Sequence, residues 1–206
     1  MTQNNKKVDV LNKIKNAVLG YDLLLNNTYL IVFEGNYIEI TFFKKNYKHL
    51  TGVMSSLSAE DFYNKAKNRQ LSENQIFFSK NHPYRTCKDK LYYLNNVDKL
   101  FLSDFFVVEN VTTLTRSYKL GFTDLNYSML FTENTDDFGN RINEVLIPAS
   151  IRVREDEFDK SSAQYSADFV FKKQNDINEK YKELIFGDLR RINEIPDEIK
   201  KLISLD

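Results

Sequence analysis

The second half of the chain consists of short apolar segments separated by polar turns, and this pattern restricts the fold more than any other feature of the sequence. Such a pattern is typical of antiparallel strands that follow one another as a meander. The expected strands cover residues 104–109, 118–122, 127–131, 144–148 and 165–172. We therefore expect the chain to fold around an antiparallel sheet.

The first half begins with a helical pattern and continues with a β-hairpin. Apolar residues between Val8 and Leu25 recur every three or four positions, which predicts a helix with one buried face. Residues 28–33 and 37–43 are rich in β-branched and aromatic side chains and flank the turn residues Glu34-Gly-Asn36. This arrangement predicts a hairpin.

Further helices are expected on both sides of the meander. Ser58 followed by Asp61 resembles a capping box, and Pro83 precedes apolar residues at near-helical spacing, which predicts helices after residue 58 and over 84–100. A last helix is expected from Asp176 to about Leu184. The sequence thus predicts an α+β fold with one domain at 1–185 and a charged, partly helical tail at 186–206. A possible docking stripe in this tail consists of Ile192, Ile195, Ile199, Leu202 and Ile203.

The composition supports one hydrophobic core and gives no global electrostatic preference. Sixteen Phe and twelve Tyr supply large apolar surfaces for burial. The 29 Lys and Arg balance the 29 Asp and Glu, so a polyanionic partner must be bound by a local patch. A single cysteine, Cys87, fits a reducing compartment, and no apolar stretch is long enough for a membrane span. We expect a cytoplasmic protein.

The sequence lacks the patterns that bind common cofactors. With six glycines it contains no glycine-rich phosphate loop and no dinucleotide fingerprint. The two histidines, His49 and His82, lack the spacing of metal ligands. We expect neither a cofactor nor a metal site, which leaves metal-independent chemistry or plain binding.

The densest group of chemically useful side chains lies in the compact polar segment 44–52 after the hairpin, where we expect His49 at the end of a strand. Lys44, Lys45 and Lys48 precede His49, and Thr51 follows it. Histidine can take up or release a proton near neutral pH, and the lysines can bind phosphate. The alternative interpretation is a lysine-rich surface loop with a histidine that caps a turn.

Other candidates have ordinary structural alternatives. Arg116, Ser117 and Lys119 surround one strand start, and Ser150 and Arg152 follow Pro148. For Arg152 and Arg154 the favoured interpretation is a solvated charge run that pairs with residues 155–157. Lys88 and Lys90 are expected on the wet side of a helix, and His82 in a turn.

Four short elements follow one another in the chain: Tyr47-Lys-His-Leu-Thr-Gly52, the Asp61-Phe-Tyr63 helix, a lysine-bearing helix and Ile147-Pro-Ala-Ser150. In the order of these elements the chain resembles phage-borne members of the barnase, EndoU, colicin and RelE-like nuclease superfamily. The resemblance covers about residues 10–185. It implies a metal-independent ribonuclease fold with a curved antiparallel sheet and a cleft. Carried over by position, His49, Thr51 and Ser150 would be catalytic, and Lys88 and Arg116 are added from chemistry alone.

Two functions of different class follow from these observations. The first is a phage or mobile-element ribonuclease that acts in the host cytoplasm, in which Lys44, Lys45, Lys48, Lys119 and Arg152 bind the RNA substrate. The second is a non-catalytic phage protein of the same fold that binds a host or phage protein, for example to inhibit a defence system. The neutral net charge favours the second. An assembly factor that docks through the tail is a third interpretation.

Overall fold

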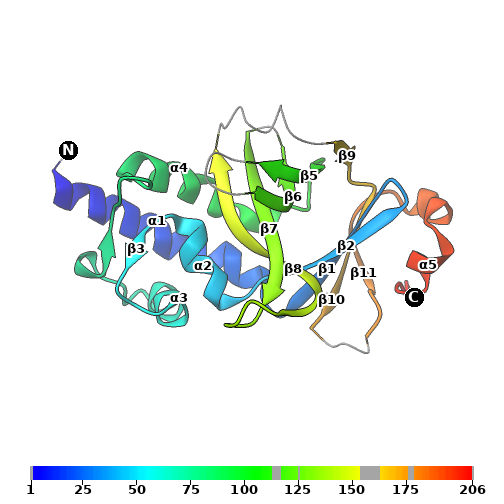
Figure 1. The fold of residues 1–206 in the computed structure, drawn as a ribbon, viewed down its shortest axis with the longest axis horizontal. Helices are drawn as coiled ribbons and strands as arrows, with labels where there is room; N and C mark the ends of the chain where they lie inside the picture. Colours follow the sequence, from blue (N-terminus) through cyan, green and yellow to red (C-terminus); the bar gives the residue numbers. More distant parts are fainter. Residues whose placement is uncertain (1, 113–116, 125, 154–162, 176–178, 206) are drawn as a thin grey trace.

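The computed structural model describes residues 2–112, 117–124, 126–153, 163–175 and 179–205, and it combines a large sheet with a layer of helices (Figure 1). The helices are α1 (Gln3–Leu24), α2 (Lys44–Thr51), α3 (Ala59–Lys67), α4 (Tyr84–Leu94) and α5 (Asp197–Lys200). Short 3-10 helices cover Glu73–Gln75 (η1), Val97–Lys99 (η2) and Leu189–Glu194 (η4).

Within these residues, a nine-stranded sheet has the order β11-β10-β1-β2-β8-β7-β6-β5-β9. Its strands are β1 (Asn27–Phe33), β2 (Asn36–Thr41), β5 (Phe106–Thr112), β6 (Ser117–Thr123), β7 (Tyr127–Thr135), β8 (Arg141–Val153), β9 (Gln164–Ser166), β10 (Phe169–Gln174) and β11 (Glu183–Phe186). A separate pair consists of β3 (Met54–Ser55) and β4 (Ile76–Phe77). The α+β class and the antiparallel-rich sheet predicted from the sequence are therefore confirmed.

Helix α1 is the centre of the helical layer (Figure 1). It begins after Thr2, whose hydroxyl accepts a hydrogen bond from the backbone N–H of Asn5 at 3.3 Å. Its buried stripe includes Val10, Ile14 and Val18, as the helical spacing predicts. Helices α3 and α4 both pack against α1, so their relative positions are fixed by the same apolar face.

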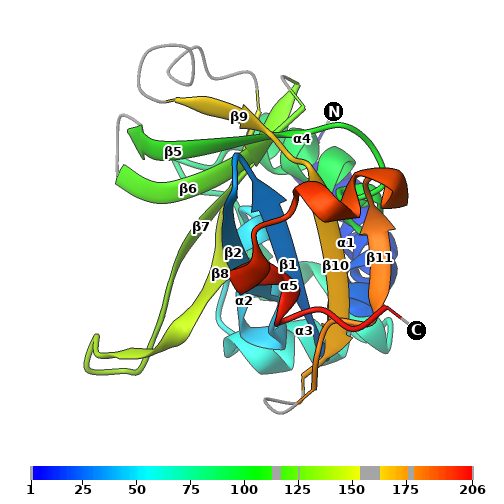
Figure 2. The same ribbon diagram turned by 90° about the vertical axis from the view of Figure 1, so that its right-hand side faces the viewer.

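Strand β1 is buried on both faces, which explains its nearly continuous apolar sequence. Tyr29 and Ile31 join the core beneath the helices. Leu30 and Val32 face the opposite side, where Ile195 and Ile199 are buried against them. Figure 2 shows the C-terminal segment on this second face. Part of the predicted docking stripe is therefore covered by the chain's own sheet.

The meander predicted for the second half is present as β5 to β8, joined by antiparallel pairing. Strand β8 connects this meander to the hairpin, because Ile40 of β2 pairs with Leu146 in parallel orientation. Strand β8 contacts α2 and α4, and its end at Ile151 to Val153 shares a cavity with residues of α4. β5 and β6 run across the direction of β10 and β11 in Figure 2.

Three local predictions were wrong. Residues 44–51 form helix α2, so His49 lies near the end of a helix and neither at the end of a strand nor in a loop. The expected strand at 165–172 is divided between β9 and β10, which lie far apart in the sheet order. The expected helix at 176–184 is not found in its described part, because Leu184 pairs with Phe171 as part of β11. Strand pairing outweighs the weak helical pattern of this short segment.

Candidate functional site

Helix α2 holds His49 at its C-terminal end, next to a glycine that ends the helix. Tyr47, Leu50 and Thr51 form the buried side of α2, whereas His49 is exposed. Gly52 follows with φ of 76°, and its N–H donates to the carbonyl oxygen of His49 at 3.2 Å. This left-handed conformation favours glycine because a Cβ atom is strained there. The His-Leu-Thr-Gly sequence is thus a helix C-terminus that fixes the backbone of His49.

Two buried tyrosines attach α2 to the rest of the helical layer. The Tyr47 hydroxyl donates to the carbonyl oxygen of Ile14 at 2.6 Å, and the Tyr21 hydroxyl donates to that of Phe43 at 2.9 Å. Both rings are fully buried and lie 5.1 Å apart between centroids. The start and the middle of α2 are therefore held on α1 by packing and by hydrogen bonds.

His82 is held in a tight turn immediately before α4. Its N–H donates to Ser79 Oγ at 3.0 Å, and the Ser79 N–H donates to the His82 carbonyl oxygen at 3.1 Å. The same carbonyl oxygen accepts from the Cys87 thiol at 3.5 Å. Burial raises the pKa of the Cys87 thiol to about 11, so the thiol keeps its proton at neutral pH. The prediction that His82 lies in a turn is confirmed, and Cys87 has a structural contact there.

Lys90 lies on the buried side of α4, and its predicted position on the wet side was wrong. Only 4% of Lys90 is exposed, and its neighbours on the same helix face are Cys87, Leu91 and Leu94. The end of α2 also contacts this face. A Cβ atom built on Gly52 would lie 3.1 Å from Lys90 Cδ, 3.5 Å from His82 Cδ2 and 3.6 Å from Cys87 Sγ. Gly52, which follows α2, therefore lies against the buried side of α4 and against His82.

A recess of about 220 Å³ opens between α4 and the end of β8, and we call it the basic recess. Its lining includes Asn81, His82, Thr86, Asp89 and Lys90 from the α4 region and Arg152 from the end of β8. The site thus combines a turn, a helix and a strand end that are distant in sequence. Asp89 is the one carboxylate among the described lining residues.

Positive groups dominate the electrostatics of the basic recess. The pKa of His82 lies below its ordinary value because burial disfavours the charged ring and because Lys90, Arg152 and His49 place positive charge near it. His82 is consequently neutral at neutral pH and can accept a proton. A histidine base beside a lysine and an arginine is an arrangement that suits a phosphate-containing ligand.

Of the predicted catalytic residues, His49 lies beside the recess, and Thr51, Ser150 and Lys88 lie elsewhere. Thr51 is fully buried, and its hydroxyl donates to the carbonyl oxygen of Lys48 at 2.7 Å. Ser150 is 7% exposed and pairs with Leu130 inside the sheet. Lys88 is exposed and lines a different cavity between α1 and α4. Arg116 lies outside the described residues, as do Arg154 and residues 155–157.

Of the predicted substrate-binding residues, Arg152 alone lines the recess among those described. Lys44 and Lys45 lie over the rings of Tyr63 and Phe43. Lys48 donates to the carbonyl oxygen of Leu57 at 2.7 Å. Lys119 forms an ion pair with Glu133 on the neighbouring strand.

The sequence prediction did not place His82 or Lys90 in a common recess, although one signal was available for the burial of Lys90. Position 90 follows Cys87 by three residues and precedes Leu94 by four, so it belongs to the apolar stripe of α4. A lysine on such a stripe is buried only where its ammonium group has a polar environment. His82 carried no comparable signal, because a histidine before a proline is an ordinary turn residue.

The described residues contain no cluster of three or more His, Cys, Asp or Glu side chains that could hold a metal ion. In the same part of the chain, no helix has the length and apolar character needed to cross a membrane.

The chain combines an α+β fold with a recess that is lined by histidine, lysine and arginine. The model of the family described as phage-Barnase-EndoU-ColicinE5/D-RelE like nuclease 4 matches residues 13–188, and the chain belongs to this family. The resemblance stated from the sequence is therefore confirmed. No curated protein and no solved structure matches the chain.

Proposed function

We propose that this protein is a metal-independent ribonuclease whose active site is the basic recess. The observation that supports the proposal is the convergence of His82, Lys90 and Arg152 in one recess, with His49 beside it. Membership of a nuclease-like family supports the same reaction class. A phage or mobile-element origin, with action in the host cytoplasm, belongs to this proposal because the family description refers to phage.

The proposed reaction uses the 2′-hydroxyl of RNA as an internal nucleophile. His82, which is neutral at neutral pH, takes the proton of the 2′-hydroxyl as its oxygen attacks the adjacent phosphorus atom. His49, in its protonated form, donates a proton to the 5′-oxygen as the P–O5′ bond breaks. The products are a 2′,3′-cyclic phosphate and a free 5′-hydroxyl. One proton is accepted and one is donated, so the step is balanced.

Lys90 and Arg152 have a separate role in the proposal. The attacked phosphorus becomes a phosphorane, which carries more negative charge on its oxygens than the phosphodiester of the substrate. Fixed cations therefore stabilise the phosphorane more than they stabilise the substrate. Lys90 is 4% exposed, so its ammonium group is held with little freedom to reorient. Arg152 can donate two parallel hydrogen bonds to phosphate oxygens. The basic character of the recess favours a phosphate over a divalent cation.

The experiment is cleavage of a defined single-stranded RNA in EDTA by the wild-type protein and by His49→Ala and His82→Ala. We expect wild-type products with 2′,3′-cyclic phosphate ends. Each histidine variant should be about 10²- to 10⁴-fold slower. The same oligonucleotide with a 2′-deoxy group at the cleavage position should not be cut.

Lys201→Ala is the control, because it removes an exposed basic residue that follows α5 and does not line the recess. It should cleave at the wild-type rate. Absence of wild-type cleavage under any metal condition would reject the ribonuclease proposal and favour a non-catalytic protein-binding function. Cleavage that EDTA abolishes would reject the metal-independent mechanism and leave a nuclease of another type.

A further inference from the structure

A second and larger cavity lies between α1 and α4 and adjoins the basic recess. We call it the α1–α4 groove, and its volume is about 510 Å³. This volume lies within the range of about 300 to 1,000 Å³ found for small-ligand sites. Asp89 and Val153 line both cavities, so a ligand that fills the groove ends next to His82, Lys90 and Arg152.

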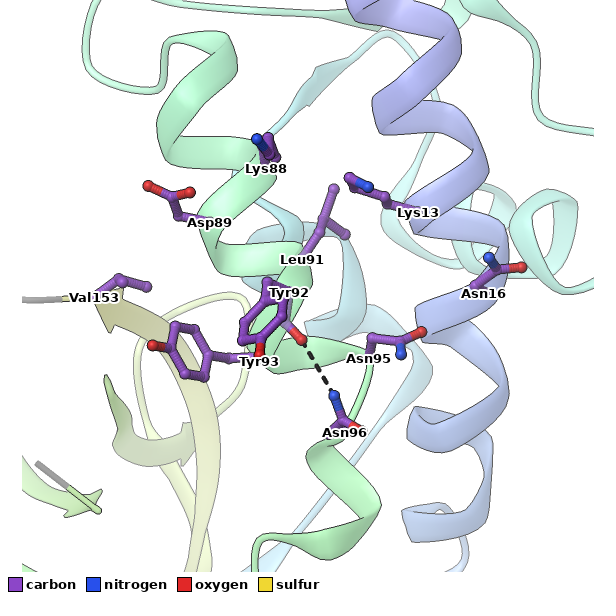
Figure 3. A pocket seen from close by; sticks show the side chains of 10 residues that line it. All are labelled: Lys13, Asn16, Lys88, Asp89, Leu91, Tyr92, Tyr93, Asn95, Asn96 and Val153. Carbon is purple, nitrogen blue, oxygen red and sulfur yellow. Dashed lines mark hydrogen bonds between the residues drawn. The ribbon is translucent and has the colours of Figure 1, made fainter. Parts of the chain in front are cut away.

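The side chains of the groove are of the kinds that bind an unpaired nucleotide. Figure 3 shows Tyr92 in the middle of the groove, with Lys13 and Lys88 toward one end and Asn95 and Asn96 toward the other. Lysines bind backbone phosphates, amides donate to and accept from base edges, and an exposed aromatic ring stacks on a base.

Tyr92 is exposed and has a fixed neighbour. The residue is 68% exposed, and its ring lies edge-to-face on Tyr93 with centroids 5.1 Å apart and planes at 90°. Tyr93 in turn stacks on Tyr127 of the sheet, at 4.5 Å and 24°. A hydrogen bond from Asn96 Nδ2 to the Tyr92 carbonyl oxygen at 3.4 Å holds the end of the helix (Figure 3). Tyr92 therefore presents a large aromatic surface to solvent on a rigid support.

We infer that the α1–α4 groove is a binding site for an unpaired nucleotide of single-stranded RNA next to the scissile phosphate. Its base stacks on Tyr92, and Lys13 and Lys88 bind neighbouring phosphates. This inference rests on the proposed function, because only that function places a scissile bond next to the bound nucleotide. A base in a duplex has both faces covered by its neighbours, so stacking on Tyr92 selects an unpaired region. Lys88, which the sequence suggested as a catalytic residue, has a binding role in this arrangement.

The test measures binding without cleavage. Its probe is a fluorescently labelled single-stranded 2′-O-methyl RNA of mixed sequence, which cannot react through its 2′-oxygen, and its comparison is the corresponding blunt duplex. We expect the wild-type protein to bind the single strand more tightly than the duplex. Tyr92→Ala should weaken single-strand binding roughly tenfold, and Tyr92→Phe should retain it because the stacking surface remains.

Tyr37→Ala is the matched control, since Tyr37 is 45% exposed at the start of β2 and does not line the groove. It should bind like the wild type. Lys13→Gln and Lys88→Gln should each reduce the slope of log affinity against log salt by roughly 0.7.

Equal binding of single strand and duplex, or unchanged binding by Tyr92→Ala, would overturn the inference even if the protein cleaves RNA. Tyr92-dependent binding by a protein that does not cleave would support the groove and reject the proposed chemistry. A protein that binds neither probe contradicts the inference, and a host-protein partner would then be the remaining interpretation of the groove.

Discussion

Gly52 and Lys90 are in close contact at the junction of α2 and α4, where a Cβ atom on Gly52 would lie 3.1 Å from Lys90 Cδ. The φ angle of Gly52 is 76°. We predict that Gly52→Ala strains the backbone by about 1 kcal/mol and displaces Lys90 by a few tenths of an ångström. RNA cleavage should fall about tenfold, because small displacements of charged groups weaken transition-state stabilisation. Urea unfolding and single-turnover cleavage measure the two effects.

Gly139→Ala is a control with the same backbone strain and no crowding. Gly139 has φ of 85° in the turn between β7 and β8, and no atom lies within 4 Å of an added Cβ. This variant should lose about 1 kcal/mol of stability and keep its cleavage rate. If both glycine variants lost activity equally, contact with Lys90 would not explain the loss.

Lys90 and Lys88 are two residues apart on α4, but Lys90 is buried and Lys88 is exposed. A second prediction follows from this difference. Lys90→Met should lower kcat about 10²- to 10³-fold, because it removes a fixed cation from the recess. Urea unfolding of Lys90→Met shows whether the variant stays folded, because Lys90 is buried and its side chain has contacts in the native structure. Lys88→Met should instead raise KM with little change in kcat.

Steady-state kinetics and urea unfolding of both variants test this contrast. Equal kinetic effects of the two substitutions would contradict the assignment of Lys90 to the recess and of Lys88 to the groove.

Much of the fold was predictable because its signals are local. The periodicity of α1, the turn at Glu34 to Asn36 and the spacing of the meander strands all lie in short windows of sequence. Helix α2 was missed because it is eight residues long and its N-cap, Phe43, makes no side-chain capping bond. Strand β11 was missed because its conformation depends on pairing with β10.

The site was predictable only in part, because it is assembled by tertiary contacts. His49 became a candidate because of the basic residues around it, and Arg152 because of its position after Pro148; their roles stay predictions. His82 and Lys90 reach the recess only through the packing of α4 against α2 and β8. No spacing in the sequence records that convergence.

A third prediction concerns Asp22, which links α1 to α3. Asp22 accepts hydrogen bonds from the Tyr63 hydroxyl and from Lys67 Nζ at 2.8 Å. Burial raises the pKa of Asp22, but the hydrogen bonds from Lys67 and Tyr63 outweigh it, and the pKa lies below 3.8. The stabilisation is therefore present above pH 3.8 and is lost as the pH falls through the lower, folded-state pKa.

Asp22→Asn should lower the free energy of unfolding by about 1 kcal/mol at neutral pH, and the difference from the wild type should shrink in acid. Asp137→Asn makes the same charge change at an exposed turn and should have little effect at any pH. Urea unfolding as a function of pH measures both. A difference that persisted in strong acid would show that packing, and not the carboxylate, links the two helices.

The lowered pKa of His82 predicts that acid destabilises the folded protein at this residue. A histidine paired with a carboxylate, whose pKa is raised, would have the opposite effect. The unfolded chain binds a proton at His82 near pH 6.5, whereas the folded protein binds it only at lower pH. The free energy of unfolding should therefore fall as the pH drops from about 6.5 to the folded-state pKa, and it should level off below that value. His82→Asn should flatten this part of the curve.

The final prediction assigns the cause of that shift. After burial, Lys90 and Arg152 are the largest contributors to the lowered pKa of His82, followed by His49. Lys90→Met and Arg152→Gln should each raise this pKa toward 6.5, because each removes a positive charge that opposes protonation. NMR titration of the imidazole C–H signals measures the pKa of His82. The chain has two histidines, so the His49→Ala variant shows which signals belong to His82. Lys88→Met should leave the pKa unchanged, since Lys88 lines the groove and not the recess. An unaltered His82 pKa in both recess variants would mean that burial alone lowers it and that the two cations lie too far from the ring to act on the same phosphate.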